Sequence, residues 1–510
     1  MVETAPPRVT LRNHFSRPYD SAIAAARTCY SPTIVTPDEI TDKQRLTIGA
    51  ATFEGGHHTV YQHAHFEFGL EYVSRQFVWS FLHSHPFYNS EQQSQRYVRL
   101  DKVQAYVPPL AGEAREVYEQ AVERAWDCYR QLSALLQEET HATLADIWHL
   151  SEISHERRKK KVARQAEKKA IEIARYVLPI AAFTTMVHTL SGIVLHRLWR
   201  MQRAGDTPTE ASAVVREMVA RVKEVDPAFF ERVGKEPLAD DELPEWPYLQ
   251  QGSTNGFRQE LNAQLGGHVS VLLDYSPHAE RVVAQAVRAV LGKSSAEMSD
   301  EAALEAVMNP AKNGYRLETL NVAAHSPLMR ALNHATYTFA KRISHTADSQ
   351  DQRHRMVPGS RPLLLATDSP EPDYITPMLI RRSPRAREVY ERAMAEAWAA
   401  KNRLLALGVA REFALYVLPN AVAVRFLESG ALIHLLHKWT MRTCFNAQEE
   451  IYQASLEEIE QVRRVHPRLM RYIGPPCSIR AGIASPICTE GSHFCGVKVW
   501  ESFPAIQRRI

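Results

Sequence analysis

The pattern of apolar and polar positions predicts alternating strands and helices, and it predicts them twice along the chain. Short apolar runs at Val9–Leu11 and Val269–Leu273 predict β-strands. Each run is followed by apolar residues at helical spacing, at Ser21–Thr28 and at Ala279–Leu291. Both halves of the chain therefore start with a strand and then a helix.

Longer periodic segments follow in each half. The helical period predicts long helices at Glu113–Leu136, Val177–Arg200 and Thr209–Val225, with counterparts in the second half. Further strand segments are predicted at Ala64–Phe68 and Ala335–Phe339. The expected fold is an α+β domain used twice, with a mostly antiparallel sheet and long helices.

The two halves are copies of one domain. The segment Ala114–Glu119 (AREVYE) recurs 272 residues later at Ala386–Glu391, and Tyr176–Pro179 (YVLP) recurs 240 residues later at Tyr416–Pro419. The second offset then holds for a series of single residues: Trp199 and Trp439, Met201 and Met441, Pro227 and Pro467, Gly234 and Gly474. The 32-residue difference between the offsets predicts an insertion in the first copy, at about 138–170.

The repeats divide the chain into four parts. We expect repeat 1 at 1–234, a Pro-, Gly- and polar-rich linker at 235–266, repeat 2 at 267–476 and a Cys-containing tail at 477–510. The insertion carries the basic run Arg157–Lys161, which favours a solvated helix face over a nucleic-acid contact.

Composition and charge narrow the possible partners. A chain of 510 residues, 45% of them hydrophobic, is long enough for two cores. Lys and Arg (61) nearly balance Asp and Glu (58), so no strong overall field attracts nucleic acid. No signal peptide or membrane-spanning run is evident, and six cysteines are few for a secreted disulfide framework. We expect a soluble cytoplasmic protein.

One polar stretch, Gln92–Tyr97 (QQSQRY), has the chemistry of a ligand-holding loop. Amides and a hydroxyl supply donors and acceptors, and the guanidinium of Arg96 matches a phosphate or carboxylate edge. A planar, uracil-like base with a phosphate would suit this set. A solvated Gln-rich turn is the alternative for the stretch by itself.

The motifs of both halves together resemble the flavin-dependent thymidylate synthase family. The first half carries GHHTVYQHAHFEF at 56–68, QQSQRYV at 92–98 and YVPP at 106–109. The second half carries the remaining similar segments: VLLDY at 271–275, HATYTF at 334–339, RHR at 353–355, MRTCFNAQEEI at 441–451 and GPPC at 474–477. The resemblance covers nearly all of both halves.

This resemblance implies an activity, cofactors and an assembly. Family members make dTMP from dUMP with methylenetetrahydrofolate as the carbon donor. Bound FAD, reduced by NADPH, supplies the hydride, and no cysteine nucleophile is used. Because the family forms homotetramers with shared sites, a chain that carries two copies is expected to form a homodimer, a pseudo-tetramer of four domains, with no membrane partner.

The resemblance also assigns roles to residues of each repeat. In repeat 1 it implies nucleotide binding by Gln92, Ser94, Gln95, Arg96 and Arg175. In repeat 2 it implies flavin binding by Thr336, Arg353, His354, Arg355 and His437, and substrate binding by Gln350 and Arg442. Arg442 matches the arginine that polarises the pyrimidine, which makes it the candidate catalytic residue.

Each repeat departs from the family pattern where the other keeps it. Repeat 1 has His83-Ser84-His85 at the Arg-His-Arg place, and Gln202 stands where Arg442 does. Repeat 2 follows its Arg-His-Arg with Met356–Arg361, which we interpret as a truncated nucleotide loop, and has Leu415 in place of Arg175. Because a shared site needs each guanidinium only once, the losses predict one composite site with groups from both repeats.

Two alternatives remain open for the function. The Asn-x-Arg flavin contacts of the family are Ser191 and Ile193 in repeat 1, and Ala431 and Ile433 in repeat 2. A non-catalytic, regulatory nucleotide-binding protein is therefore one alternative. Flavin-dependent modification of another nucleotide or an RNA base is the other, because fold does not fix substrate.

Two clusters of metal-ligating residue types have plainer explanations. Cys477, Cys488 and Cys495, with His493 nearby, could form a zinc set, but their spacings are looser than those of a CxxC knuckle. Reduced thiols packed on repeat 2 are the favoured interpretation. The histidines at 57, 58, 63 and 65 are expected to be core or substrate-facing residues, and no metal is predicted.

Overall fold

The computed structural model describes residues 2–150, 156–251 and 255–510. Residues 151–155 of the predicted insertion and Gly252–Thr254 of the predicted linker lie outside the described residues. No described helix combines the length and the apolar character that crossing a membrane requires.

Repeat 1 contains one sheet and two groups of helices. Its strands and helices are β1 (Arg8–His14), α1 (Pro18–Thr28), α2 (Asp42–Glu54), β2 (His65–Ser74), α3 (Arg75–His83), β3 (Tyr88–Gln92), α4 (Gly112–Ile147), α5 (Glu156–Ala174), β4 (Phe183–Ser191), α6 (Gly192–Arg200), α7 (Pro208–Val225) and α8 (Ala228–Glu231). Two short helices, α9 (Trp246–Gln251) and α10 (Gly256–Leu265), lie in the segment predicted as a linker.

Repeat 2 has a similar order of elements, with two further short helices, α14 and α15, after its third strand. They are β5 (Ser270–Tyr275), α11 (Ala279–Leu291), α12 (Asp300–Met308), β6 (Thr336–Ser344), α13 (His345–Asp351), β7 (Gly359–Ser360), α14 (Leu364–Thr367), α15 (Met378–Arg382), α16 (Pro384–Ala406), α17 (Arg411–Leu415), β8 (Ala423–Ala431), α18 (Leu432–Arg442), α19 (Glu449–Val465) and α20 (Pro476–Arg480). Short 3-10 helices connect them, among them η4 (Arg175–Val177) in repeat 1 and η8 (Met329–His334) in repeat 2.

Two antiparallel sheets of the same topology confirm the α+β fold used twice. The strand orders are β1-β2-β4-β3 and β5-β6-β8-β7. The prediction of one long helix at Val177–Arg200 is wrong, because strand β4 occupies its centre and only α6 is helical. Buried and more exposed residues alternate along β4, and its threonines favour a strand, so the period is 2 there. The same error applies to the counterpart, where β8 precedes α18.

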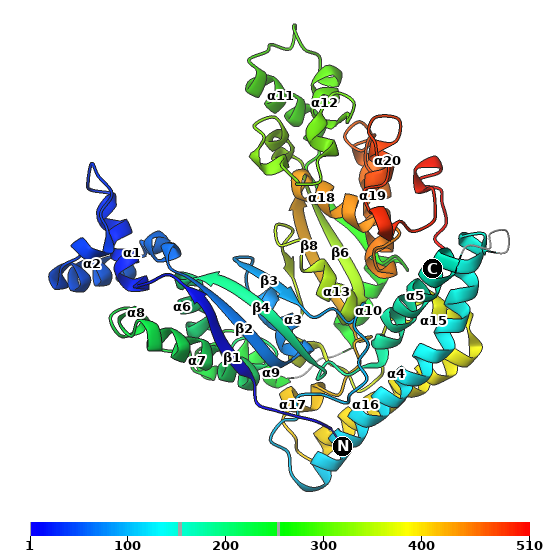
Figure 1. Ribbon diagram of the computed structural model, residues 1–510, viewed down its shortest axis with the longest axis horizontal. Helices are drawn as coiled ribbons and strands as arrows, with labels where there is room; N and C mark the ends of the chain where they lie inside the picture. Colours follow the sequence, from blue (N-terminus) through cyan, green and yellow to red (C-terminus); the bar gives the residue numbers. More distant parts are fainter. Residues whose placement is uncertain (1, 151–155, 252–254) are drawn as a thin grey trace.

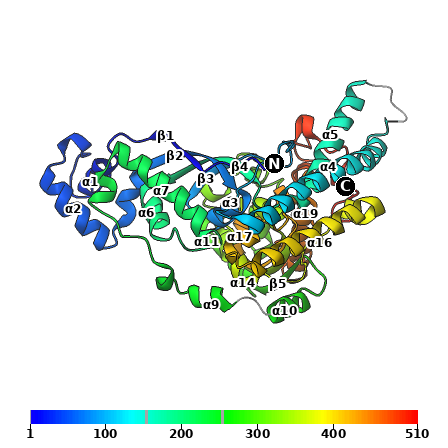
Figure 2. The same cartoon turned by 90° about the horizontal axis from the view of Figure 1, so that it is seen from below.

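The long helices form a common base from which the sheets extend. Helices α4, α5 and α16 lie side by side, and the two sheets diverge from them, with α1 and α2 at the far end of repeat 1 and α11 and α12 at the far end of repeat 2 (Figure 1). In the view from below, α9 and α10 lie along the lower edge of the picture (Figure 2). One core cluster draws residues from both repeats, whereas two others each lie within one repeat.

The repeats meet through their YVLP segments. Backbone N–H groups of Ile180 and Asn420 donate to the carbonyls of Leu418 and Leu178, both at 2.8 Å. Pro179 and Pro419 face each other in an antiparallel bridge. The two copies of one motif therefore pair with each other, as expected around a pseudo-twofold axis.

A buried carboxylate repeats on each side of this axis. Glu210 accepts hydrogen bonds from the backbone N–H (2.7 Å) and hydroxyl (2.6 Å) of Ser74, the N-cap of α3. It also accepts one from the hydroxyl of Tyr416 in the other repeat, at 2.6 Å. Glu450 does the same with Ser344, the N-cap of α13, and with Tyr176. Each repeat thus fixes the start of its own helix with a tyrosine from its neighbour.

The insertion forms the end of α4 and most of α5, which together make a helical hairpin. Helix α5 packs along α4, and Val162 and Ala166 are buried in the contact. Arg157, Lys159 and Lys160 are exposed, in agreement with a solvated helix face.

Glu210 makes the stability of this junction depend on pH. Burial raises its pKa from 4.5 to about 7. Between these values the folded protein holds a proton that the unfolded chain releases, so stability is lost as pH rises through the window. We expect the melting temperature of wild type, relative to Glu210→Gln, to fall between about pH 5 and pH 8. Parallel curves would contradict this, and the exposed Glu217→Gln serves as the control.

Candidate functional site

A cavity of about 630 Å³ lies where the two repeats meet. It brings together most of the residues predicted from the two halves: Gln92, Ser94, Gln95, Arg96 and Arg175 from repeat 1, and Gln350, Arg353, His354, Arg355, His437 and Arg442 from repeat 2. Thr336 is not among its lining residues. It lies at the start of β6, where its hydroxyl is 2.7 Å from that of Ser276.

The backbone brings these groups together from both repeats. The loop Gln93–Tyr97 continues from β3, the edge strand that pairs with β4. Arg175 follows directly after α5, and Arg353–Arg355 follow the C-cap residue of α13, Gln352. Because α5 belongs to repeat 1 and α13 to repeat 2, the composition of the cavity depends on the pairing of the repeats.

Arg96 is held in place by both repeats. Its guanidinium pairs with Glu172 and donates to the carbonyl of Asn446 at 2.7 Å. It also reaches Gln350 Oε1 at 3.3 Å. Burial lowers the pKa of Arg96, but Glu172 more than offsets this, so the net shift is upward. Arg96 is therefore a charge already balanced by protein, with less capacity for an added anion than its sequence position suggests.

Arg442 is positioned by the Arg-His-Arg segment. Its Nε donates to Nε2 of His354 at 2.8 Å, and its Nη2 donates to the carbonyl of Gln350 at 3.0 Å. Burial and the nearby Arg96 and Arg353 lower its pKa to about 10, so it stays cationic at neutral pH. Burial and Arg442 also lower the pKa of His354, which keeps that ring neutral and able to accept the bond.

The other two arginines of that segment are more accessible. The side chain of Arg353 is 47% exposed and lies 3.4 Å from Glu91. Arg355 reaches the carbonyl of Pro86 at 3.4 Å and Asn89 Oδ1 at 3.2 Å. These long contacts leave both guanidiniums able to bind an anion.

Three buried donors at the cavity lack a hydrogen-bond partner among the described residues: Arg75 Nε, Gln95 Nε2 and Arg175 Nη2. Their residues are only 2–4% exposed, and all three line the cavity. Six arginines and one acidic residue, Glu91, line it within the described part of the chain. Because unpaired buried donors are costly, this cluster indicates an anionic ligand.

Arg75 was missed by the sequence analysis. It is the first residue of α3, and its Nη1 donates to Gln92 Oε1 at 3.3 Å. Burial and the like charges of Arg175 and Arg353 lower its pKa to about 9. The available signal was one arginine among the apolar residues that follow Ser74, with His345 at the matching place in repeat 2.

The histidines that replace the arginines in repeat 1 are not cationic substitutes. His83 and His85 are mostly buried, and burial lowers the pKa of each to about 4. Neutral imidazoles do not compensate a phosphate as guanidiniums do. The division of guanidiniums between the two repeats therefore exists in the folded chain.

The metal candidates are not supported. All six cysteines are free thiols, with Cys477 buried and Cys488 and Cys495 half-buried. Across residues 2–150, 156–251 and 255–510, no group of three or more His, Cys, Asp or Glu side chains could hold a metal ion. The described residues therefore give no support to a zinc set of Cys477, Cys488 and Cys495.

The boundary of the nucleotide loop in repeat 2 also needs correction. Ser90 pairs with His188 in one sheet, and Gly359 pairs with Glu428 in the other. With the 240-residue offset, Gly359 matches Ser90, so the counterpart of Gln92–Tyr97 is 361–366 rather than 356–361.

Comparison with known families matches both halves of the chain. The profile described as "Thymidylate synthase complementing protein" matches residues 10–228 and 271–468. Two separate matches fit the tandem arrangement of the two sheets.

The chain is similar in sequence to several flavin-dependent thymidylate synthases. The enzyme of Sulfurisphaera tokodaii is 38% identical over 29% of this chain and 58% of its own length. The enzyme of Clostridium tetani is 28% identical over 44% of this chain and 86% of its own length. The enzyme of Sulfolobus acidocaldarius is 31% identical over 41% of this chain and 77% of its own length. A solved UMP/dUMP methylase from Streptomyces cacaoi, bound with 5-Br dUMP, is 18% identical over 46% of this chain and 99% of its own, with a TM-score of 0.31.

Because Arg75 has no carboxylate partner in the described part of the chain, we expect it to lower the stability of the ligand-free protein and to favour anion binding. Replacing a buried charge that lacks a carboxylate partner by an apolar side chain is neutral or stabilising. We expect Arg75→Met to keep or raise the melting temperature of the ligand-free protein, while inorganic phosphate stabilises the variant less than wild type. A lower melting temperature without phosphate would show that Arg75 supports the fold instead.

Proposed function

The chain belongs to the thymidylate synthase complementing protein family, and from this premise we propose that it is a flavin-dependent thymidylate synthase with a composite site. The proposed reaction converts dUMP to dTMP with methylenetetrahydrofolate as the carbon donor, FAD as the cofactor and NADPH as the reductant. Repeat 1 would hold the nucleotide and repeat 2 the flavin.

The observation that carries this proposal is the set of buried donors at the cavity. Arg75, Gln95 and Arg175 each have a nitrogen without a partner among the residues the structure describes, and all three come from repeat 1. A nucleotide phosphate is an anion of the right kind to satisfy such donors. The curated relatives, named for thymidylate synthesis, support a uridine nucleotide as its source.

The residues of repeat 2 fit a flavin with a pyrophosphate. Arg353 and Arg355 line the cavity with accessible guanidiniums, and His437 lies on the same wall. These residues would hold FAD, which supplies the hydride of the reaction when bound. The relatives named flavin-dependent support this assignment.

Arg442 would act on the pyrimidine. It is half-buried, cationic and fixed by two hydrogen bonds, one to His354 and one to the carbonyl of Gln350. A preorganised guanidinium stabilises negative charge that develops on a bound ring without reorganising during the reaction. His354 has a positioning role because it accepts the bond from Nε of Arg442.

The carbon donor has room beside the main cavity. A second cavity of about 1050 Å³ shares Arg96 and Tyr97 with the first. It lies between the α4–α5 hairpin and the C-terminal segment, and residues such as Leu144, Phe445 and Ile506 give it apolar walls. We propose methylenetetrahydrofolate as the ligand of this second cavity.

The alternative is a nucleotide-binding protein without catalysis. Ile193 and Ile433 replace the flavin-contacting arginine in both repeats, and both are buried in apolar clusters. Purified protein settles the choice. Yellow protein with about one flavin per chain that forms dTMP supports the enzyme, whereas colourless protein that binds dUMP but takes up no FAD supports the alternative.

If only repeat 2 contacts the flavin, matching substitutions in the two repeats should have unequal effects on FAD binding. Arg353→Ala and Arg355→Ala should each weaken FAD binding about tenfold to a hundredfold, because a charge-assisted bond to a phosphate contributes ~1.5–3 kcal/mol. His83→Ala and His85→Ala, at the places in repeat 1 that match Arg353 and Arg355, should leave most of the FAD affinity, since these rings are buried and neutral. Flavin titration measures all four, and equal losses at the histidines would assign the cofactor to the wrong repeat.

The nucleotide arginines should behave as one network. Arg96→Ala, Arg175→Ala and Arg442→Ala should each weaken dUMP binding to flavin-loaded protein and leave FAD affinity almost unchanged. Their combined effects should be non-additive, since they surround one cavity. Calorimetry with dUMP measures this. Normal affinity in Arg96→Ala together with a loss in Arg361→Ala would assign the nucleotide to repeat 2.

We also propose a homodimer as the functional assembly. The family resemblance implies four domains per assembly, and two tandem chains supply four. Light scattering at micromolar concentration is expected to give twice the mass of the 57.9 kDa chain. A stable monomer that binds flavin would contradict the proposal.

A further inference from the structure

The pseudo-twofold relation between the repeats generates a second position that mirrors the composite site. At this mirrored position, repeat 2 would supply the nucleotide loop and repeat 1 the flavin contacts. The strand pairings identify its residues, because Gly359 matches Ser90 in the register of the two sheets. Counting onward, Leu364 and Leu365 stand where Gln95 and Arg96 stand.

Leucines replace the polar groups of the composite site at the mirrored position. Leu364, Leu365 and Leu415 match Gln95, Arg96 and Arg175, and they are only 3%, 8% and 2% exposed. All three belong to the core cluster shared by the repeats. Trp79, which matches Ser349 when counted from the N-cap serines, is 2% exposed and lies in the same cluster. The space that holds polar groups in one site holds packed apolar side chains in the other.

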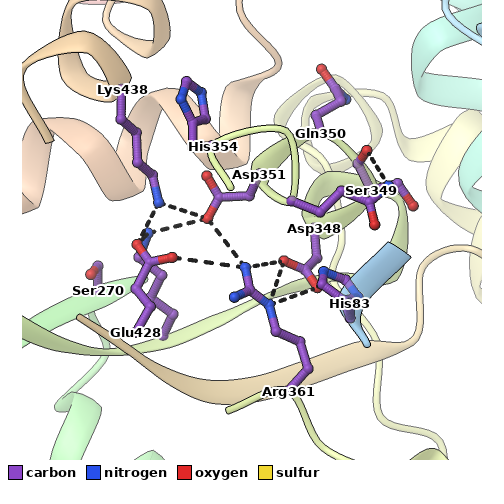
Figure 3. Close-up of polar contacts among 12 residues, drawn as sticks. His83, Ser270, Asp348, Ser349, Gln350, Asp351, His354, Arg361, Glu428 and Lys438 are labelled. Atoms are coloured by element: carbon purple, nitrogen blue, oxygen red, sulfur yellow. Dashed lines mark hydrogen bonds and ion pairs between the residues drawn. The ribbon is translucent and has the colours of Figure 1, made fainter. Parts of the chain in front are cut away.

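The charged groups Arg361 and Asp348 at the mirrored position are paired with each other. Arg361, at the place of Gln92, donates to Asp348 Oδ1 at 2.9 Å. Trp79 Nε1 donates to Asp348 Oδ2 at 2.9 Å, and His83 Nε2 lies 3.3 Å from the same oxygen. Figure 3 shows Arg361 between Asp348 and His83 on one side and Asp351 and Glu428 on the other. A guanidinium surrounded by carboxylates has no capacity for a phosphate.

We propose that the mirrored position is permanently closed, so that each chain takes one nucleotide and one flavin. This rests on the proposed function for the identity of the ligands, but the closure rests on packing alone. A duplicated chain that kept two equivalent sites would take two of each.

Residues of the closed position also help to orient helix α13, which contributes to the composite site. Asp348 and Asp351 lie on α13, and Ser349 and Gln350 between them line the composite cavity. Asp351 pairs with Lys438 at 2.9 Å and with Lys341 at 3.3 Å, and all of these groups are buried. Trp79 and Arg361 are therefore positioning residues that fix the orientation of α13 from the closed side.

Packing at the mirrored position can be tested without any ligand. We expect Leu365→Arg to lower the melting temperature by several degrees or to prevent folding, because it buries a charge in a packed apolar cluster. The volume-conserving Leu365→Met should be tolerated, and Leu320→Arg at an exposed site should have no effect. An unchanged melting temperature in Leu365→Arg would mean that the position is open, and would overturn the proposal.

Stoichiometry tests the consequence. Calorimetric titration of wild type with FAD, and then of flavin-loaded protein with dUMP, is expected to give one of each per chain. Arg175→Ala should weaken dUMP binding at every site measured, with no high-affinity fraction left. Two ligands per chain, or half the sites intact in Arg175→Ala, would overturn one-site binding. If Leu365→Arg behaves as expected but wild type binds neither ligand, the closure stands, whereas the proposed function and the stoichiometry drawn from it fail.

The positioning role needs a readout that stability alone does not change. Trp79→Phe keeps the packing but removes the N–H that donates to Asp348, so it should weaken dUMP binding several-fold with stoichiometry unchanged. Tyr19→Phe, which loses a 2.6 Å hydrogen bond to the carbonyl of Arg45 far from the cavity, is the control for lost stability. Equal dUMP affinity in the two variants would contradict positioning through α13.

Discussion

The antiparallel pairing of Tyr176–Pro179 with Tyr416–Pro419 is the constraint on which the rest of the structure depends. It joins two copies of one motif, so each group on one side has a counterpart on the other. The tyrosines of the pair reach carboxylates that hold the N-cap serines of α3 and α13, and these helices begin at Arg75 and His345. Junction, helix position and cavity wall are thereby linked through a few buried hydrogen bonds.

Duplication within one chain removes the requirement that both sites be kept. In an assembly of identical subunits, a substitution enters every site, so a lost arginine is lost everywhere. In a tandem chain, Arg175 can persist while its counterpart becomes Leu415. The released position then gains apolar burial, which stabilises the junction at roughly 25 cal/mol per Å² of buried apolar area. The mirrored position has thus lost binding groups and gained apolar packing.

At the cavity between the repeats, charged side chains are kept where the mirrored position has apolar packing. Arg75 and Arg175 are buried and Arg442 is half-buried, and the pKa of each is lowered because burial disfavours the charged form and other arginines lie close by. Such a cluster reduces the stability of the ligand-free protein, and an anion that satisfies it recovers that cost on binding. Arg361 differs from these three arginines, because its charge is balanced by Asp348 and its neighbours.

The sequence determined the tandem α+β fold, the family and the division of motifs between the halves, because these rest on local patterns and repeat offsets. It placed β4 and β8 inside longer helices, because each strand runs directly into a helix, α6 or α18, and the apolar residues of the two elements form one continuous series. Only the tertiary structure revealed Arg75 as a cavity residue, Arg96 as a charge already paired with Glu172, and the closure around Leu365. Each depends on which side chains meet across the repeat junction, and contacts between residues far apart in the chain leave no trace in local sequence pattern.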